Sequence, residues 1–308
     1  MRATLKHTAE RALVRSGLAA ILRRRRRWAV TVLAYHNVVP DEVAGRGDVG
    51  LHLPVSRFRE QLDALAEYAD VLPLEKIRDV PPAAPGRIRV AITFDDASRG
   101  AVTDGAAELR RRGLPATIFV APGILGGRTC WWDAYGATTD AAFRRRAIED
   151  CAGDEELVGA LARDSGLTPA PLPPEYGTAT EAELRAAACD PLLTLGSHGV
   201  THRNLARLPP DQVAIELATS LEWLRERFGH VLSVLAYPFG RWSPQVSEAA
   251  ARGGYSAACL STGGPMDPHS SPQFAIPRLS IPAGLSRDGF ELALAGFRWS
   301  RAHTRTRD

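Results

Sequence analysis

Short apolar segments rich in β-branched residues alternate with amphipathic helical segments along most of this 308-residue chain. The clearest apolar segments are 30–36, 88–94, 116–121, 192–196 and 232–237. Such an alternation predicts a parallel sheet with right-handed crossovers, either closed as a (β/α) barrel or open. The catalytic groups of these folds lie at the carboxyl ends of the strands.

Further elements are expected around this frame. Residues 58–68 have apolar residues at helical spacing, with Ser56 as the N-cap. Residues 131–190 are polar and mostly helical, with a proline-rich break at 169–174, and we interpret them as a helical insertion. The other expected elements are helices at 101–112, 210–228, 244–252 and 286–297, and strands at 71–74, 255–260 and 275–281.

The N-terminus is basic. Residues 1–29 hold nine Lys and Arg against one acid, Glu10, whereas the whole chain carries a net charge of +3. We expect a basic amphipathic helix that either lies on an anionic membrane surface or packs on the barrel. No stretch resembles a secretory signal or a membrane span. A cytoplasmic protein, in part peripheral to the membrane, is therefore expected, with a barrel over 30–300 and a basic tail at 301–308.

Two classes of site are disfavoured. The four cysteines, Cys130, Cys151, Cys189 and Cys259, form no C-x-x-C pair, which indicates reduced cysteines instead of a thiolate metal site. No nucleic-acid partner is expected, because the arginine run lacks interleaved aromatic residues.

Polar side chains follow four of the predicted strands. The acids Asp95 and Asp96 follow one strand, and the stretch 197–202 with His198 and His202 follows another. The turn 237–240 and the residue His36 follow two more. Each feature alone is ordinary, as a turn, a helix cap or a buried histidine. Together on one rim they indicate a catalytic site.

These residue types suggest metal chemistry. If the chain turns helical at His198, then His202 four residues later shares its face, and both can bind one divalent ion with one carboxylate. Zn²⁺ fits this ligand set, and Co²⁺ or Ni²⁺ are also admissible. Neighbouring strand residues face opposite ways, so at the strand break one acid can face the metal and the other the substrate, where it acts as a general base.

Three stretches, T-F-D-D at 93–96, S-H-G-V-T-H at 197–202 and Y-P-F-G at 237–240, resemble the polysaccharide deacetylases, carbohydrate esterase family 4. The resemblance covers residues 30–300. It implies a distorted (β/α) barrel in which Asp96, His198 and His202 hold the metal and Asp95 is the catalytic base. The turn that contains Tyr237 and Phe239 would contribute the backbone N–H of Phe239 to the oxyanion.

The family also uses a Leu-x-x-His motif to protonate the leaving amine. Here this form occurs at 33–36, near the N-terminus, as in a circularly permuted subgroup that includes poly-N-acetylglucosamine deacetylases. The resemblance therefore assigns the general acid to His36, with His269 as the substitute.

Some positions depart from the family. Ala97 replaces a Gly, Gly199 replaces a Ser or Thr, and Ala236 replaces the Arg that orients the base. Arg278, at the end of the last strand, is a candidate to supply that guanidinium. Trp132, at the start of the insertion, can stack on a sugar ring, although packing of the insertion on the barrel is the more common role.

The function expected from these features is N-deacetylation of an N-acetylated saccharide, whether polymeric, oligomeric or lipid-linked. An amidohydrolase of the same fold acting on a non-carbohydrate amide or imide is the alternative. A catalytically inactive binding module on a membrane surface is a third interpretation, and the intact metal motif argues against it.

Overall fold

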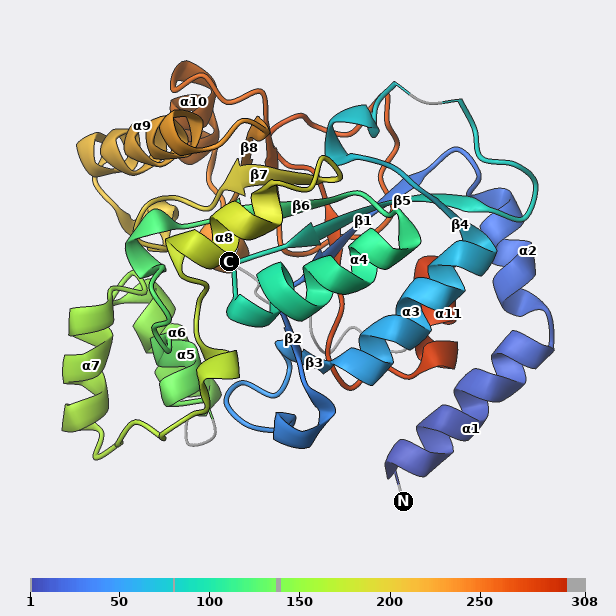
Figure 1. Ribbon diagram of the computed structural model, residues 1–308, viewed down its shortest axis with the longest axis horizontal. Helices are drawn as coiled ribbons and strands as arrows, with labels where there is room; N and C mark the ends of the chain where they lie inside the picture. Colours follow the sequence, from blue (N-terminus) through green and yellow to red (C-terminus); the bar gives the residue numbers. More distant parts are fainter. Residues whose placement is uncertain (1, 80, 137–139, 298–308) are drawn as a thin grey trace.

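The computed structural model describes residues 2–79, 81–136 and 140–297. Within these residues, parallel strands form a nearly closed barrel surrounded by helices (Figure 1). The strand order is β10-β1-β5-β6-β7-β8-β9, and β4 pairs with β5 beside this path. Strand bounds are β1 Val30–Tyr35, β4 Ala69–Val71, β5 Ile88–Phe94, β6 Ala116–Val120, β7 Leu193–Ser197, β8 Val231–Ala236, β9 Ala257–Cys259 and β10 Arg278–Ser280.

The barrel closes irregularly between β9 and β10. The segment that precedes β10 runs along β9, where the Ile276 N–H donates to Ala258 O at 2.9 Å and the Leu260 N–H donates to Ile276 O at 2.8 Å. The Arg278 N–H then donates to Thr262 O at 3.2 Å. These bonds bring β10 to the open edge, so the predicted distorted (β/α) barrel is confirmed.

Successive strand residues alternate between the inside of the barrel and the surrounding helices. One buried cluster contains only barrel and loop residues, among them Val32, Ala91, Phe119, Ala236 and Cys259. A second cluster joins the alternate strand positions to the helices, with members such as Leu33, Ile92, Leu62, Leu109 and Phe290. Every second residue counted from Ala91 along β5 therefore points into the barrel, and this places the Asp95 side chain inside.

The surrounding helices lie close to where the sequence predicts them. Their bounds are α3 Val55–Tyr68, α4 Ala106–Arg112, α8 Glu181–Ala188, α9 Pro210–Arg227, α10 Pro244–Arg252 and α11 Arg287–Leu294. The predicted helix at 101–112 begins as a π-helical turn, Ala101–Gly105, and ends at Gly113, whose φ of 64° suits a glycine C-cap. The Ser56 N-cap is wrong: α3 begins at Val55, and the Ser56 hydroxyl instead binds Asp41.

The predicted helical insertion packs on the end of β6 as a cluster of short helices. These are α5 Trp131–Ala134, α6 Ala141–Glu149 and α7 Glu155–Asp164, followed by α8. Asp140 and Asp154 cap α6 and α7 through their side chains. The insertion shares a buried cluster with Ala121 and Ile124, which follow β6 directly. The insertion therefore stands beside the carboxyl ends of the strands (Figure 1).

The basic N-terminal segment forms two helices, α1 Arg2–Arg15 and α2 Leu18–Arg25, separated at Gly17 with a φ of 79°. Arg23 of α2 is buried and pairs with Glu291 of α11 at 2.7 Å. Apolar residues of both helices pack with α11: Ala19, Leu292 and Ala295, with Leu13, Val14, Leu22 and Phe297 around them. Much of the apolar face expected for this segment is thus covered by protein.

Among the described residues, no helix is both long and apolar enough to cross a membrane. The four cysteines are free thiols, as expected. The tail predicted at 301–308 lies outside the described residues.

Candidate active site

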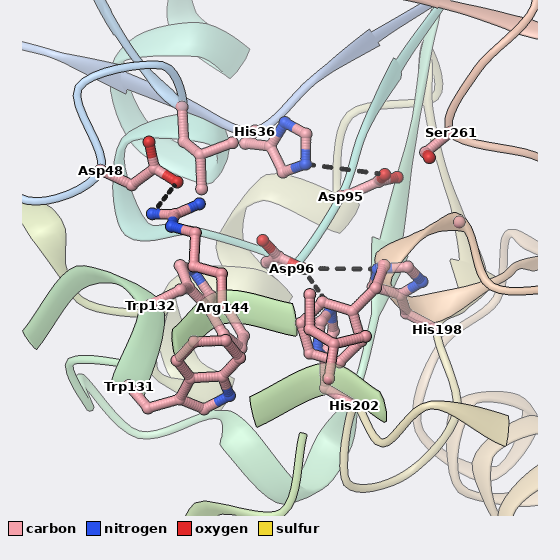
Figure 2. A pocket seen from close by; sticks show the side chains of 14 residues that line it. His36, Asp48, Asp95, Asp96, Trp131, Trp132, Arg144, His198, His202 and Ser261 are labelled. Carbon is pink, nitrogen blue, oxygen red and sulfur yellow. Dashed lines mark ion pairs between the residues drawn. The ribbon is translucent and has the colours of Figure 1, made fainter. Parts of the chain in front are cut away.

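The polar residues predicted at the strand ends meet in one pocket of about 150 Å³ (Figure 2). Asp95 and Asp96 follow β5, His198 follows β7, and His36 follows β1. The pocket is lined by His36, Asp48, Leu51, Asp95, Asp96, Trp131, Trp132, Arg144, Ile148, His198, His202, Phe239, Gly240 and Ser261.

Asp96, His198 and His202 form a compact group whose ligand atoms all lie within 4.8 Å of one another. Oδ1 of Asp96 lies 3.4 Å from Nε2 of His198 and 3.0 Å from Nε2 of His202. All three residues are buried. Two imidazole nitrogens and one carboxylate oxygen at these separations suit a divalent ion with bonds of about 2.0–2.2 Å.

The backbone explains how these side chains converge. Asp96 and His202 have φ values of 67° and 58°, in the left-handed region that non-glycine residues seldom adopt. The turn at Asp96 redirects its side chain from the strand alternation, so Asp95 and Asp96 face different parts of one pocket. The chain does not turn helical at His198: residues 198–202 form an irregular loop that still brings both histidines to Asp96.

The loop is fixed from behind by a carboxylate. Glu216 of α9 is buried and accepts hydrogen bonds from the N–H groups of Val200 and Thr201 at 2.6 and 3.0 Å. The loop thereby holds His202 against Asp96 without helical geometry. Glu216 lies on a distant helix, so no local pattern in the sequence connects it with this loop.

Two features of the group fit a metal. The ring Nδ1 of His198 lies 2.7 Å from Ala236 O, so the Nδ1–H tautomer leaves the lone pair of Nε2 free to bind a metal. The Oδ1 atom of Asp96 is buried and accepts no hydrogen bond from the described residues. Burial raises the pKa of Asp96, but the neighbouring His202 and His198 outweigh it and hold that pKa well below its usual range. An ionised buried oxygen without a donor is suited to a cation.

Asp95 is bound by Arg278. Nη1 and Nη2 of this arginine donate to the two carboxylate oxygens at 2.7 Å each. Nη1 also donates to Thr93 at 3.0 Å, and Nε donates to Leu260 O at 2.6 Å. Burial raises the pKa of Asp95, and Arg278 and His198 together lower it below its usual value. Position 236, where the family has an arginine, holds Ala236 here. Arg278 on β10 places a guanidinium on Asp95 from another strand.

The two candidate general acids lie in different places. Nε2 of His36 is 3.9 Å from Oδ2 of Asp95, and the imidazole lines the pocket (Figure 2). His269 is exposed and does not line the pocket. Only His36 is therefore placed to reach a substrate beside Asp95.

The turn at 237–240 sends its two aromatic side chains in different directions. Phe239 lines the pocket with a φ of 56°, and its ring centre lies 4.5 Å from that of His202. Tyr237 is fully buried outside the pocket, and its hydroxyl donates to Phe274 O at 2.9 Å. The structure therefore does not bring the Tyr237 side chain to the site, because it points outward whereas Ala236 points inward.

The paired tryptophans both border the pocket. The ring centre of Trp132 lies 4.6 Å from that of His202, and Trp131 and Trp132 contact Phe239. Both side chains are less than a tenth exposed. They pack the insertion on the barrel and form an apolar wall beside His202.

Sequence reasoning missed the pocket residues that come from loops and from the insertion. Asp48 and Arg144 form an ion pair of 2.7 Å at the pocket, and Ser261 lines the side next to β9. No motif marks these positions, since Asp48 and Ser261 lie outside regular elements and Arg144 is one of three consecutive arginines on α6.

A parallel barrel with paired acids and histidines at the carboxyl ends of its strands defines the class of (β/α) barrel enzymes. The chain belongs to the polysaccharide deacetylase family, whose model matches residues 83–258. Membership of this family indicates a hydrolase of carbohydrate amides. His36 lies outside the matched residues, so the circular permutation stays a prediction.

Solved structures share this fold at low sequence identity. The deacetylase PplD of Streptococcus pyogenes, solved with acetate, has a TM-score of 0.60 and 17% identity over 86% of this chain and 98% of its own. IcaB of Ammonifex degensii has a TM-score of 0.60 and 18% identity over 87% and 97%. The BpsB deacetylase domain of Bordetella bronchiseptica has a TM-score of 0.56 and 18% identity over 83% and 96%. No curated protein matches the chain.

Proposed function

We propose that the protein is a metal-dependent N-deacetylase that hydrolyses the acetamide of an N-acetylated amino sugar in a poly-, oligo- or lipid-linked saccharide. The observation that carries this proposal is the meeting of a buried Asp-His-His group, a second carboxylate and His36 in one pocket. Family membership supports the reaction class.

Asp96, His198 and His202 would hold the ion, most simply Zn²⁺, with Co²⁺ or Ni²⁺ as alternatives. When bound, such an ion lowers the pKa of water and polarises a carbonyl oxygen. The Ala236 carbonyl keeps the His198 ring oriented for this role through the 2.7 Å hydrogen bond to Nδ1.

The remaining residues divide the proton transfers between them. Asp95 accepts the proton of the attacking water, and Arg278 fixes the direction of its carboxylate. His36 donates a proton to the leaving amine from the same side of the pocket. The backbone N–H of Phe239 stabilises the oxyanion. Trp132 and Phe239 form an apolar wall beside His202.

A second candidate is an amidohydrolase acting on a small non-carbohydrate amide. The observation in its favour is the size of the pocket, about 150 Å³, below the roughly 300–1,000 Å³ usual for drug-sized ligands. The catalytic residues would be the same, so only the substrate separates the two candidates.

The discriminating experiment measures product release from N-acetylglucosamine oligomers and from a panel of simple acetamides, formamides and cyclic imides. The Asp95→Asn variant serves as the control for contaminating activity. We expect acetate from the saccharides and little turnover of the simple amides. Turnover of simple amides alone would select the second candidate.

We also propose that the basic N-terminal helices contact an anionic membrane surface. Ile21 of α2 and Trp28, in the turn after α2, are 52% and 58% exposed, and the exposed Arg24 and Arg25 lie between them in the sequence. We expect sedimentation with phosphatidylglycerol vesicles that weakens with salt and in a Trp28→Ser variant. Ile215→Ser, which removes a 62% exposed residue from α9, is the matched control. Equal sedimentation of all variants would contradict this contact.

A further inference from the structure

One side of the pocket is walled by a pair of segments that are far apart in the sequence. Arg144 of α6 extends past the tryptophans, and its Nη2 lies 2.7 Å from Oδ2 of Asp48, in the loop between β2 (Asn37–Val39) and β3 (His52–Pro54) (Figure 2). Both side chains line the pocket and are partly exposed, 36% for Arg144 and 18% for Asp48. The ion pair therefore bridges the loop and the insertion at the pocket.

Asp48 is held in place by contacts that do not involve Arg144. Its backbone N–H donates to Oδ1 of Asp133 at 3.0 Å, and its own Oδ1 accepts the Gly50 N–H at 3.1 Å. Asp133 is buried in α5, and the same Oδ1 lies 2.5 Å from Nε2 of His52. The carboxylate that faces Arg144 is thus fixed by contacts that do not depend on Arg144.

Beneath the ion pair, the described parts of the loop and of the insertion touch each other. A Cβ placed on Gly136, at the end of α5, would lie 2.7 Å from both the Asp48 nitrogen and the carbonyl carbon of Gly47. The two backbones are therefore in direct contact. Leu51 and Ile148 extend the same wall along the pocket.

A saccharide that runs across a site needs an opening on two sides of the reacting sugar. The wall stands on one side, and the pocket of about 150 Å³ is smaller than the roughly 300–1,000 Å³ usual for drug-sized ligands. We propose that the Asp48–Arg144 ion pair is a specificity-determining strut, which restricts this enzyme to the N-acetylated sugar at one end of a saccharide. The inference rests on the proposed function and adds the position of the sugar within its chain.

Truncation of Arg144 should open the wall without unfolding the protein. An ion pair exposed to this degree contributes little to stability, and the contacts of Asp48 with Asp133 and Gly50 remain. Arg145→Ser is the matched control, because Arg145 lies next to Arg144 on α6 and is exposed, but does not line the pocket. Asp48→Asn is a second variant, which removes the charge and keeps the acceptor for Gly50.

The test uses zinc-loaded full-length protein and N-acetylglucosamine oligomers from the dimer to the hexamer, labelled at the reducing end. Mass spectrometry locates each lost acetyl group. We expect the parent protein and Arg145→Ser to act on one terminal residue, with kcat/KM independent of length. Arg144→Ser should act on internal residues and gain about tenfold in kcat/KM on the hexamer relative to the dimer, and Asp48→Asn should change in the same direction.

Calorimetry in an Asp95→Asn background measures oligomer binding by each protein. This measurement distinguishes an error in the proposed role of the Asp48–Arg144 ion pair from an error in the proposed deacetylase function. Internal deacetylation by the parent protein would overturn the strut and keep the deacetylase. Length-independent binding that becomes length-dependent with Arg144→Ser would support the strut even if no acetate is released. Absence of binding by every oligomer would overturn both.

Discussion

Arg278 binds both carboxylate oxygens of Asp95 at 2.7 Å from strand β10, across the intervening strand β1 of the barrel. Both side chains point into the barrel, and Arg278 is fully buried. The guanidinium therefore balances the charge of the proposed base and fixes its direction. No other cation among the described residues makes an ion pair with this carboxylate, apart from His36 at 3.9 Å if it is protonated.

Substitution of Arg278 should affect stability and turnover differently. Arg278→Met leaves a buried carboxylate without its partner, which costs about 3–5 kcal/mol of unfolding free energy. Arg278→Lys keeps the charge and loses the paired geometry, so kcat/KM should fall about a hundredfold with a smaller loss of stability. Denaturant unfolding and acetate-release kinetics measure the two effects. Full activity of Arg278→Lys would contradict the positioning role.

Substitution of His36, the assigned general acid, and of His269, its substitute, should affect turnover differently. His36→Gln should lower kcat about 100-fold to 10,000-fold, because it removes the proton donor for the leaving amine. His269→Gln should leave kcat unchanged, since His269 is exposed away from the pocket. Steady-state kinetics on the same saccharide compares them. A large loss with His269→Gln and none with His36→Gln would reverse the assignment.

Metal binding should stabilise the folded protein. A ligand that binds only the native state at 100 times its Kd adds about 2.7 kcal/mol. Added Zn²⁺ should therefore raise the thermal midpoint of chelator-treated protein. His202→Ala should lose this rise, because one nitrogen of the group is gone. An equal rise in both proteins would place the metal elsewhere.

The Glu108 carboxylate should make the free energy of unfolding depend on pH in the acidic range. Burial raises the pKa of Glu108, but Arg111, Arg59 and Arg112 outweigh it and lower that pKa to about 2. The unfolded chain then binds the proton more tightly, so this contribution is complete above about pH 4.5 and is lost as the pH falls toward about 2.

The matching measurement is denaturant unfolding of the parent protein and Glu108→Gln across this range. The variant should be about 1–3 kcal/mol less stable at neutral pH, and the difference should shrink toward pH 2. Glu60→Gln, which breaks a half-exposed ion pair on α3, is the control and should cause little change. A stability difference between the parent protein and Glu108→Gln that does not change with pH would contradict the lowered pKa of Glu108 as its cause.

The parts of the fold with a regular period were predictable. The strand 88–94 and the stop at Gly113 follow from apolar alternation and from glycine at a C-cap, and both are observed. The strand-end rule placed Asp95 and His198 on one rim for the same reason. Arg278 was also a candidate, although the strand β10 begins at this residue and does not end there.

Other features depend on contacts that the sequence does not display. The left-handed turn at His202 replaces the expected helix because Glu216 of a distant helix holds the loop. Tyr237 was predicted as a site residue, but it follows the inward-facing Ala236. Strand alternation alone therefore indicates that its side chain points away from the site. Asp48 and Arg144 meet only through tertiary packing of a loop and an insertion, so no local pattern marks them.

The most direct test of the proposed mechanism combines metal content with acetate release from N-acetylglucosamine oligomers. We predict that the parent protein releases acetate with one bound metal ion, that His202→Ala loses the metal and the activity, and that Asp95→Asn keeps the metal and loses the activity. Acetate release by metal-free protein, or by Asp95→Asn at the parent rate, would contradict it.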